Sequence, residues 1–150
     1  MDVLNAKGIG NAIAEVVKRG NPVLGICIGC QIILEESEED GGVKTLGLLP
    51  GRAVRFQSEP GIKIPHMGWN QVHWTKEHEL FKGIPSGSEF YYVHSYHPSV
   101  PSEYAFAETT YGTQTFQGVV GKRNLMAAQF HLEKSGEVGL QFLKNFCAWG

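Results

Sequence analysis

The stretch that decides the fold lies at residues 22–31, which read PVLGICIGCQ. PVLGI is a short apolar run suited to a buried β-strand, and residues 32–34 resume an apolar pattern as a helix. Between them lies Cys27, in a turn that needs small residues such as Gly25 and Gly29 where neighbouring backbone crowds it. The segment predicts strand, tight turn and helix, with Cys27 exposed at the turn as a candidate nucleophile.

Cys27 has three interpretations. As a nucleophile at a helix N-terminus, its thiolate is favoured by unpaired N–H groups and the helix dipole, and the Ile28 amide is placed to stabilise an oxyanion. Cys27 and Cys30 also form a C-x-x-C pair, which is typical of redox motifs or half of a metal site. The third interpretation is that the cysteines are simply buried. The spacing alone leaves all three open.

A cysteine nucleophile needs a base, and the base needs a group that orients it. Among the six histidines, His131 ends the apolar run LMAAQF. We therefore expect it at the C-terminal end of a strand, where open α/β sheets build their sites. Glu133 follows two residues later and can reach the same ring. A histidine without catalytic role, on a loop after a strand, fits this pattern equally well.

The rest of the chain mixes helices with short strands. Apolar residues at 9, 13, 16 and 17 predict one face of a helix, and a second helix follows Ser135, which we expect to cap it. The acidic run at 35–40 is expected to be an exposed loop. The region from about 50 to 122 is β-rich; strands are predicted at 52–56, 68–74, 89–96, 104–109, 115–121 and 125–131. No linker or repeat interrupts the chain, so we expect one α/β domain over residues 1–150.

Composition disfavours several classes of function. The 13 basic and 15 acidic residues give a net charge of −2, which provides no field for nucleic acid. No apolar run is long enough to span a membrane, and the N-terminus lacks a secretory signal pattern. The odd count of 3 cysteines favours the cytoplasm over a disulfide scaffold. The scattered histidines, including the pair His73 and His78, lack nearby cysteine pairs, so we expect neither metal nor cofactor.

Two motifs together, GICIGCQ (25–31) and QFHLEKSG (129–136), resemble the class I glutamine amidotransferases. That family hydrolyses glutamine with a Cys-His-Glu triad and passes ammonia to a partner synthase. HMGWNQV (66–72) and FYYVHSYHP (90–98) are more specific, and resemble the glutaminase subunit of imidazole glycerol phosphate synthase, an enzyme of histidine biosynthesis. The resemblance runs from about residue 9 to the end. It implies a flavodoxin-like α/β sheet flanked by helices.

The resemblance also implies roles for individual residues. Cys27 is similar to the nucleophile of the family, His131 to its general base and Glu133 to the partner of that base. Gln31 is similar to the glutamine that helps to hold the substrate. His94, Ser95 and Tyr96 are similar to the segment of the family whose backbone binds the amino-acid end of glutamine.

A partner protein is implied as well. In the family, ammonia travels to a (β/α)8-barrel cyclase subunit, and Trp69, Tyr91 and Lys134 resemble positions that face this barrel. Tryptophan is enriched among residues that dominate binding energy, which favours Trp69 as an anchor. The alternatives are a core tryptophan in a β-strand for Trp69 and a solvated lysine near a helix start for Lys134.

Three features depart from the family pattern. The family's opening strand, helix and second strand, and a Pro-Gly-x-Gly loop that supplies an oxyanion donor, have no counterpart here. We therefore expect a domain that lacks its first strands and has an exposed edge on the Cys27 strand; losing one oxyanion donor typically costs about 10²–10³ in turnover. Leu132 replaces the proline that usually follows the histidine. Cys30 replaces an apolar residue, and we expect it to pack in the core.

These residues predict a glutaminase subunit that supplies ammonia to a cyclase in imidazole glycerol phosphate synthesis. One alternative is a truncated, non-catalytic binding or assembly member of the family. Another is a paralogue that feeds a different synthase. A third is a redox protein that uses the pair Cys27 and Cys30.

Overall fold

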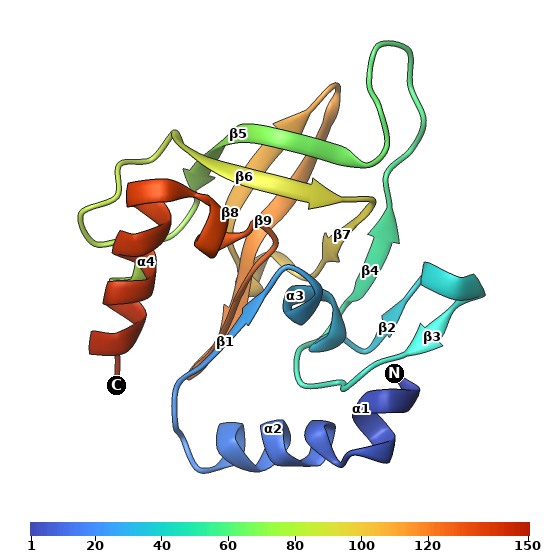
Figure 1. Cartoon of the computed structure of the whole chain (residues 1–150), viewed down its shortest axis with the longest axis vertical. Helices are drawn as coiled ribbons and strands as arrows, with labels where there is room; N and C mark the ends of the chain where they lie inside the picture. The colour runs from blue at the N-terminus through green and yellow to red at the C-terminus, as the bar shows by residue number, and fades with distance from the viewer.

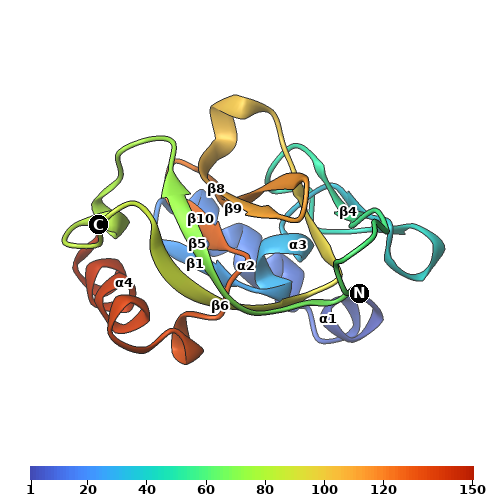
Figure 2. The ribbon, with the colours of Figure 1, turned by 90° about the horizontal axis from the view of Figure 1, so that it is seen from above.

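Two β-sheets and two long helices build the computed structural model, which describes residues 1–150 (Figures 1 and 2). The α-helices are α1 (Asp2–Ala6), α2 (Ile9–Lys18), α3 (Ile28–Ile32) and α4 (Gly136–Ala148). The strands are β1 (Val23–Ile26), β2 (Glu36–Ser37), β3 (Val43–Lys44), β4 (Arg52–Arg55), β5 (His66–Trp74), β6 (Ser88–His94), β7 (Tyr96–Ser99), β8 (Ala105–Tyr111), β9 (Gln114–Lys122) and β10 (Leu125–Ala128). Short 3-10 turns are η1 (Glu39–Gly41), η2 (Glu79–Phe81), η3 (Ser102–Tyr104) and η4 (Leu132–Lys134).

The larger sheet is mixed, with strand order β1-β10-β9-β8-β5-β6. Only its first pair, β1 with β10, is parallel, and the register joins Val23 to Leu125 and Ile26 to Ala128. The smaller sheet has the order β3-β2-β4-β7. The structure therefore confirms the α/β class. The parallel pair matters most for function, because parallel strands end at the same edge of a sheet.

Strand β10 lies at the centre of the core. All four of its residues are buried, and they alternate between two apolar clusters. Met126 and Ala128 join the cluster of Phe90, Phe130 and Phe142, whereas Leu125 and Ala127 join the other. A strand that is buried on both faces has a continuous apolar sequence, which explains the run LMAAQF.

Most elements predicted from the sequence are present, with four corrections. The predicted strand at 125–131 ends at Ala128, and the one at 89–96 is interrupted at Ser95 between β6 and β7. The acidic run contains β2 and η1 instead of only an exposed loop, and Ser37 in it is buried. Ser135 occupies the N-cap position of α4 but makes no side-chain cap hydrogen bond.

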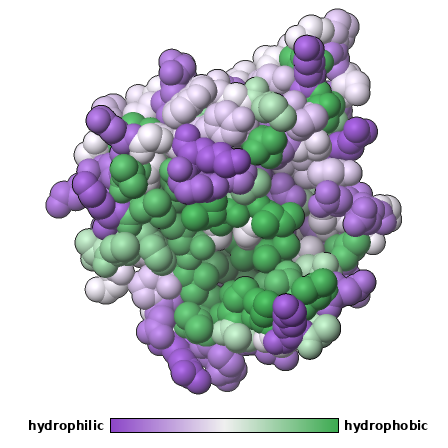
Figure 3. Space-filling model, in the orientation of Figure 1, coloured by the Kyte–Doolittle hydropathy of each residue, from purple (hydrophilic) through white to green (hydrophobic).

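A continuous hydrophobic area lies on the face seen in Figure 1, between α4, β1 and α2 (Figure 3). Strand β1 is at the edge of the larger sheet and is half-buried throughout. Helix α2 has no buried residue, and Ile9 and Val16 on it are exposed. The expected exposed edge on the Cys27 strand is thus present. None of the helices combines the length and the hydrophobicity that crossing a bilayer requires.

Candidate active site

Cys27 lies in a strained turn between β1 and α3. Its backbone has φ 51° and ψ −104°, a conformation that L-residues rarely adopt outside functional sites. The turn needs Gly25, because a Cβ atom there would lie 2.8 Å from the Gly29 carbonyl oxygen. The predicted order of strand, turn and helix is therefore present, with three corrections: β1 is half-buried, the helix is Ile28–Ile32 instead of 32–34, and a Cβ atom at Gly29 would meet nothing within 4 Å.

The parallel pairing of β1 and β10 brings the cysteine and histidine motifs to one edge of the sheet. Cys27 N–H donates to the Ala128 carbonyl at 2.8 Å, and the chain continues from Ala128 through Gln129 to His131. His131 N–H then donates to the Tyr91 carbonyl at 2.9 Å. The Ser135 hydroxyl donates to the His131 carbonyl at 2.5 Å and accepts from Tyr91 N–H at 3.0 Å. Strand β6 and Ser135 thus hold the histidine segment.

His131 and Glu133 form a pair, as their spacing predicts. His131 Nδ1 lies 2.5 Å from Glu133 Oε1, which leaves Nε2 of the ring for proton transfer. Partial burial acts to raise the pKa of the Glu133 carboxyl. The hydrogen bond from His131, a backbone amide and the nearby charges outweigh it and hold the pKa below its ordinary value. Glu133 is therefore a carboxylate suited to orienting the imidazole.

The thiol of Cys27 differs from the expectation of a favoured thiolate. Burial is the largest influence and raises the pKa of Cys27, and the Glu133 charge adds to it, while the Ile28 N–H and Lys134 act in the opposite direction. Helix α3 has 5 residues, too few to outweigh burial. The sulfur accepts from Gln129 Nε2 at 3.9 Å, and no hydrogen bond joins it to His131. To act as a nucleophile, Cys27 would therefore need a base that deprotonates it during attack.

A cavity of about 340 Å³ opens beside Cys27. Its lining includes the predicted nucleophile and oxyanion donor and the predicted substrate-binding residues: Cys27, Ile28, Gln31, His94, Ser95 and Tyr96. Glu39 also lines it and is its only charged residue. Glu39 is exposed like most of the acidic run, and nothing in the sequence distinguishes it from its neighbours, so sequence analysis missed it. His131 and Glu133 are not among the lining residues.

The three residues predicted to face a partner lie together. Trp69 pairs with Tyr91 across β5 and β6, with ring centroids 6.0 Å apart, and Lys134 Nζ lies 5.9 Å from the centre of the Tyr91 ring. Trp69 is 54% exposed, which rules out a core tryptophan, and Met67 beside it on the same face is 61% exposed. We call Met67, Trp69, Tyr91 and Lys134 the aromatic patch. Because Tyr91 also bonds His131, this patch adjoins the candidate site.

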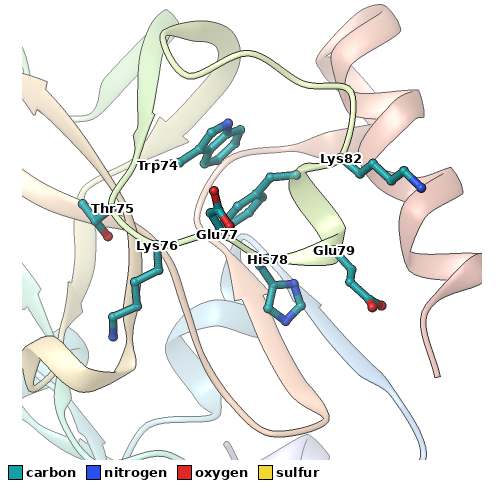
Figure 4. Close-up of a pocket in the computed structure, with 8 residues that line it drawn as sticks. Trp74, Thr75, Lys76, Glu77, His78, Glu79 and Lys82 are labelled. Atoms are coloured by element: carbon teal, nitrogen blue, oxygen red, sulfur yellow. The ribbon is translucent and has the colours of Figure 1, made fainter.

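A second, larger cavity of about 680 Å³ lies away from Cys27 (Figure 4). One continuous segment, 74–82, supplies its whole lining, and the side chains of Lys76 and Lys82 point away from each other. His78 in it uses Nδ1 to accept the Leu80 N–H. No cysteine lines this cavity. Nowhere in the structure do three or more His, Cys, Asp or Glu side chains converge as metal ligands.

The structure also settles the state of the remaining cysteines. Cys30 is fully buried in the core, which raises the pKa of its thiol, as expected for a packing residue. Cys147 is exposed on α4. All three cysteines are free.

Comparison with known proteins identifies the family. The family described as Glutamine amidotransferase class-I matches residues 2–148. Proteins named "Imidazole glycerol phosphate synthase subunit HisH" are similar: that of Synechococcus sp. (strain JA-3-3Ab) is 50% identical over 97% of this chain and 68% of its own length. The protein of the same name from Gloeobacter violaceus is 48% identical over 95% of this chain and 64% of its own length. The chain thus spans about two thirds of the length of these relatives.

Solved structures share the fold at low sequence identity. A crystal structure of a glutamine amidotransferase gives a TM-score of 0.68 at 15% identity, covering 97% of this chain and 72% of the other. A glutamine amidotransferase from Thermotoga maritima gives a TM-score of 0.62 at 16% identity, covering 95% of this chain and 54% of the other. The α/β fold implied by the sequence motifs matches these structures, with a mixed larger sheet in which β1 and β10 are the only parallel pair. The chain belongs to the class I glutamine amidotransferase family.

Proposed function

We propose that this chain is a glutaminase subunit that hydrolyses glutamine and supplies ammonia to the cyclase of imidazole glycerol phosphate synthase, in histidine biosynthesis. One observation carries the proposal: the strained Cys27 and the His131–Glu133 pair share the edge where β1 and β10 end. The relatives named as part of that synthase support the choice of acceptor. In this proposal, residues 1–150 form a single glutamine amidotransferase domain that lacks the first strands of the family.

The proposed reaction assigns one proton shuttle to His131. As Cys27 Sγ attacks the side-chain amide carbon of glutamine, His131 Nε2 takes the thiol proton, while Nδ1 stays bonded to Glu133. The Ile28 N–H stabilises the oxyanion. His131 then gives the proton to the departing nitrogen, the C–N bond breaks, and ammonia leaves a glutamyl thioester.

Water completes the cycle. His131 Nε2 takes a proton from water as its oxygen attacks the thioester carbon. The C–S bond then breaks, the proton returns to Sγ, and glutamate is released. During both halves, Gln31 and the His94–Tyr96 segment line the cavity for the substrate. The carboxylate of Glu39, the only charge in that lining, suits the α-ammonium group of glutamine.

The aromatic patch is the proposed docking site for the cyclase, a (β/α)8-barrel protein. Its exposed tryptophan and methionine offer the large apolar anchors that interfaces favour. Its contact with the His131 segment through Tyr91 supports delivery of ammonia next to the site where it forms. The three free cysteines support a reducing cytoplasm as the location.

The test is glutamate release from glutamine, measured with the purified chain alone and with the cyclase of a relative. We expect release that the cyclase increases, that Cys27→Ala abolishes, and that the exposed-cysteine variant Cys147→Ala leaves unchanged. Glu39→Gln should raise KM about tenfold while retaining kcat, because it removes a charge that contacts bound substrate. Release that persists in Cys27→Ala would refute the proposed nucleophile.

A non-catalytic assembly protein is the second candidate. The observation that favours it is that burial raises the pKa of Cys27 and that the sulfur bonds to Gln129 instead of His131. It predicts tight binding of the cyclase with no glutamate release under either condition. A chain that releases glutamate only when another synthase is added would instead indicate a paralogue with a different acceptor.

A further inference from the structure

Two buried histidines, neither of which transfers a proton in the proposed reaction, lie together beside the site, and His94 also lines its cavity. His66 on β5 is 3% exposed and His94 on β6 is 5% exposed. His66 Nδ1 lies 3.0 Å from His94 Nε2. The His66 ring stacks between Tyr92 and Tyr111, with centroids 4.8 and 4.0 Å away.

The partners of the two rings determine where every hydrogen lies. His94 Nδ1 is 2.8 Å from the Tyr96 carbonyl oxygen, which only accepts, so Nδ1 carries the proton. In neutral His94, Nε2 then accepts, and His66 Nδ1 must donate to it. His66 Nε2 accepts in turn from Asn70 Nδ2 at 3.2 Å, an amide whose nitrogen also donates to the Thr110 carbonyl at 2.9 Å.

Both rings are held neutral by their surroundings. Burial lowers the pKa of His66 to about 4 and that of His94 to about 3. The rings stacked on His66 are those of Tyr92 and Tyr111, which carry no negative charge at neutral pH. The charges that act on His94 are those of His66, His97 and His131, and each of them opposes protonation of His94. The hydrogen assignment therefore holds at neutral pH.

The other end of the chain of hydrogen bonds reaches the nucleophile. The Tyr96 carbonyl also accepts from Gln31 Nε2 at 3.0 Å, and the second hydrogen of that nitrogen goes to Gln129 Oε1 at 3.1 Å. Because Gln129 Oε1 accepts this bond, the other end of its amide, Nε2, points toward Cys27 Sγ, 3.9 Å away. Gln129 is fully buried, so this orientation is not exchanged with water. The orientation of both amides thus follows from the carbonyl that His94 holds.

We propose that His66 and His94 are positioning residues, which orient the Gln31 and Gln129 amides so that a buried N–H faces the Cys27 sulfur. The proposal rests on the proposed glutaminase function, and it extends the site to Asn70, next to Trp69 of the aromatic patch. We call the series Asn70, His66, His94, Gln31 and Gln129 the relay. The relay lowers the energy of the thiolate as it forms, because Gln129 donates to it.

The sharpest perturbation reverses one end of the relay without changing its size. Asn70→Asp replaces the Nδ2 donor with an oxygen. His66 Nε2 must then carry a proton, so that either His66 becomes charged or both imidazoles switch tautomer. A tautomer switch turns a lone pair of His94 toward the Tyr96 carbonyl. The matched control is Gln71→Glu, which adds the same charge at an exposed neighbour that has no side-chain bond to the relay.

Two readouts follow this change independently of glutamine turnover. Imidazole ¹⁵N NMR at pH 7 reports the protonated nitrogens of His66 and His94. The rate of alkylation by iodoacetamide, in a Cys147→Ser background, reports the Cys27 thiolate, since Cys30 is fully buried. Circular dichroism checks that each variant is folded, and His66→Phe provides a second variant that keeps an aromatic ring but severs the relay.

We expect Nδ1–H tautomers for both rings in the parent, and a charged His66 or switched tautomers in Asn70→Asp. Alkylation at pH 8 should slow about tenfold in His66→Phe, and in Asn70→Asp when its NMR shows switched tautomers, because a donor to the thiolate is then misplaced. An Asn70→Asp variant with a charged His66 keeps the His94 Nδ1–H bond and should react at the parent rate, as Gln71→Glu should. A parent-like rate in His66→Phe, a parent-like rate in an Asn70→Asp variant whose tautomers have switched, or Nε2–H tautomers in the parent would overturn the proposal. Absence of glutamate release with these shifts intact would reject the proposed function alone.

Discussion

Ser135 allows a direct test of two structural roles that predict opposite orders of stability. Its position before α4 is that of a helix cap, whereas in the structure its hydroxyl joins Tyr91 N–H to the His131 carbonyl and makes no cap bond. If Ser135 were a cap, Ser135→Asp would be as stable as the parent, and Ser135→Ala would lose about 1 kcal/mol. The structure predicts a different order.

The magnitude follows from the bonds that are lost. Ser135 is 1% exposed. Ser135→Ala leaves Tyr91 N–H without its partner, while the His131 carbonyl keeps a bond from Lys134 N–H at 3.2 Å. One buried unsatisfied donor costs about 1–3 kcal/mol, so we expect a loss of about 2 kcal/mol. Ser135→Asp should lose more than Ser135→Ala, because a carboxylate in this site faces the His131 carbonyl and cannot donate to it.

Urea unfolding followed by circular dichroism measures the free energy of unfolding of each variant. Ser88→Ala is the matched control, since the Ser88 hydroxyl donates to the Pro85 carbonyl at the surface, and its loss should change stability by about 0.5 kcal/mol or less. A Ser135→Asp variant as stable as the parent, or more stable than Ser135→Ala, would refute the reasoning.

Three further predictions concern the fold, the pH response and the partner surface. Gly25→Ala should cost about 1–3 kcal/mol, because its Cβ would lie 2.8 Å from the Gly29 carbonyl oxygen, whereas Gly29→Ala meets nothing within 4 Å and should be neutral in the same urea titration. The pKa values of His66 and His94, about 4 and about 3, lie below the unfolded value, so the unfolded chain binds more protons. Stability should therefore be complete above about pH 6.5 and fall toward pH 4 by on the order of 3 kcal/mol for each ring, or about 6 kcal/mol for the pair; a urea midpoint that stays constant over this range would contradict it. Trp69→Ala should leave the melting temperature almost unchanged, because the side chain is 54% exposed, yet weaken cyclase binding by about 2 kcal/mol in calorimetry. Unaltered affinity would remove Trp69 from the interface.

Local sequence was sufficient wherever a feature depends on residues close together in the chain. The turn at Cys27 depends on Gly25, two residues away, and the His131–Glu133 bond joins side chains two residues apart. Short-range patterns also placed α2, α4 and most strands. The motif resemblance identified the family because it matches residue types at fixed spacing, and the comparisons confirm that identification.

Packing between distant parts of the chain decided the remaining features. Gln129 and Cys27 are separated by 102 residues, and His66 and His94 by 28, so only the sheet register brings each pair within bonding distance. Glu39 is exposed, as its acidic neighbours suggest, but only the fold shows that it lines the same cavity as Ile28 and Gln31 of α3. The residues alone were enough to indicate the class of fold, the family and the candidate nucleophile. Which polar groups surround that nucleophile, and whether burial favours its thiolate, depended on contacts between strands that sequence spacing does not encode.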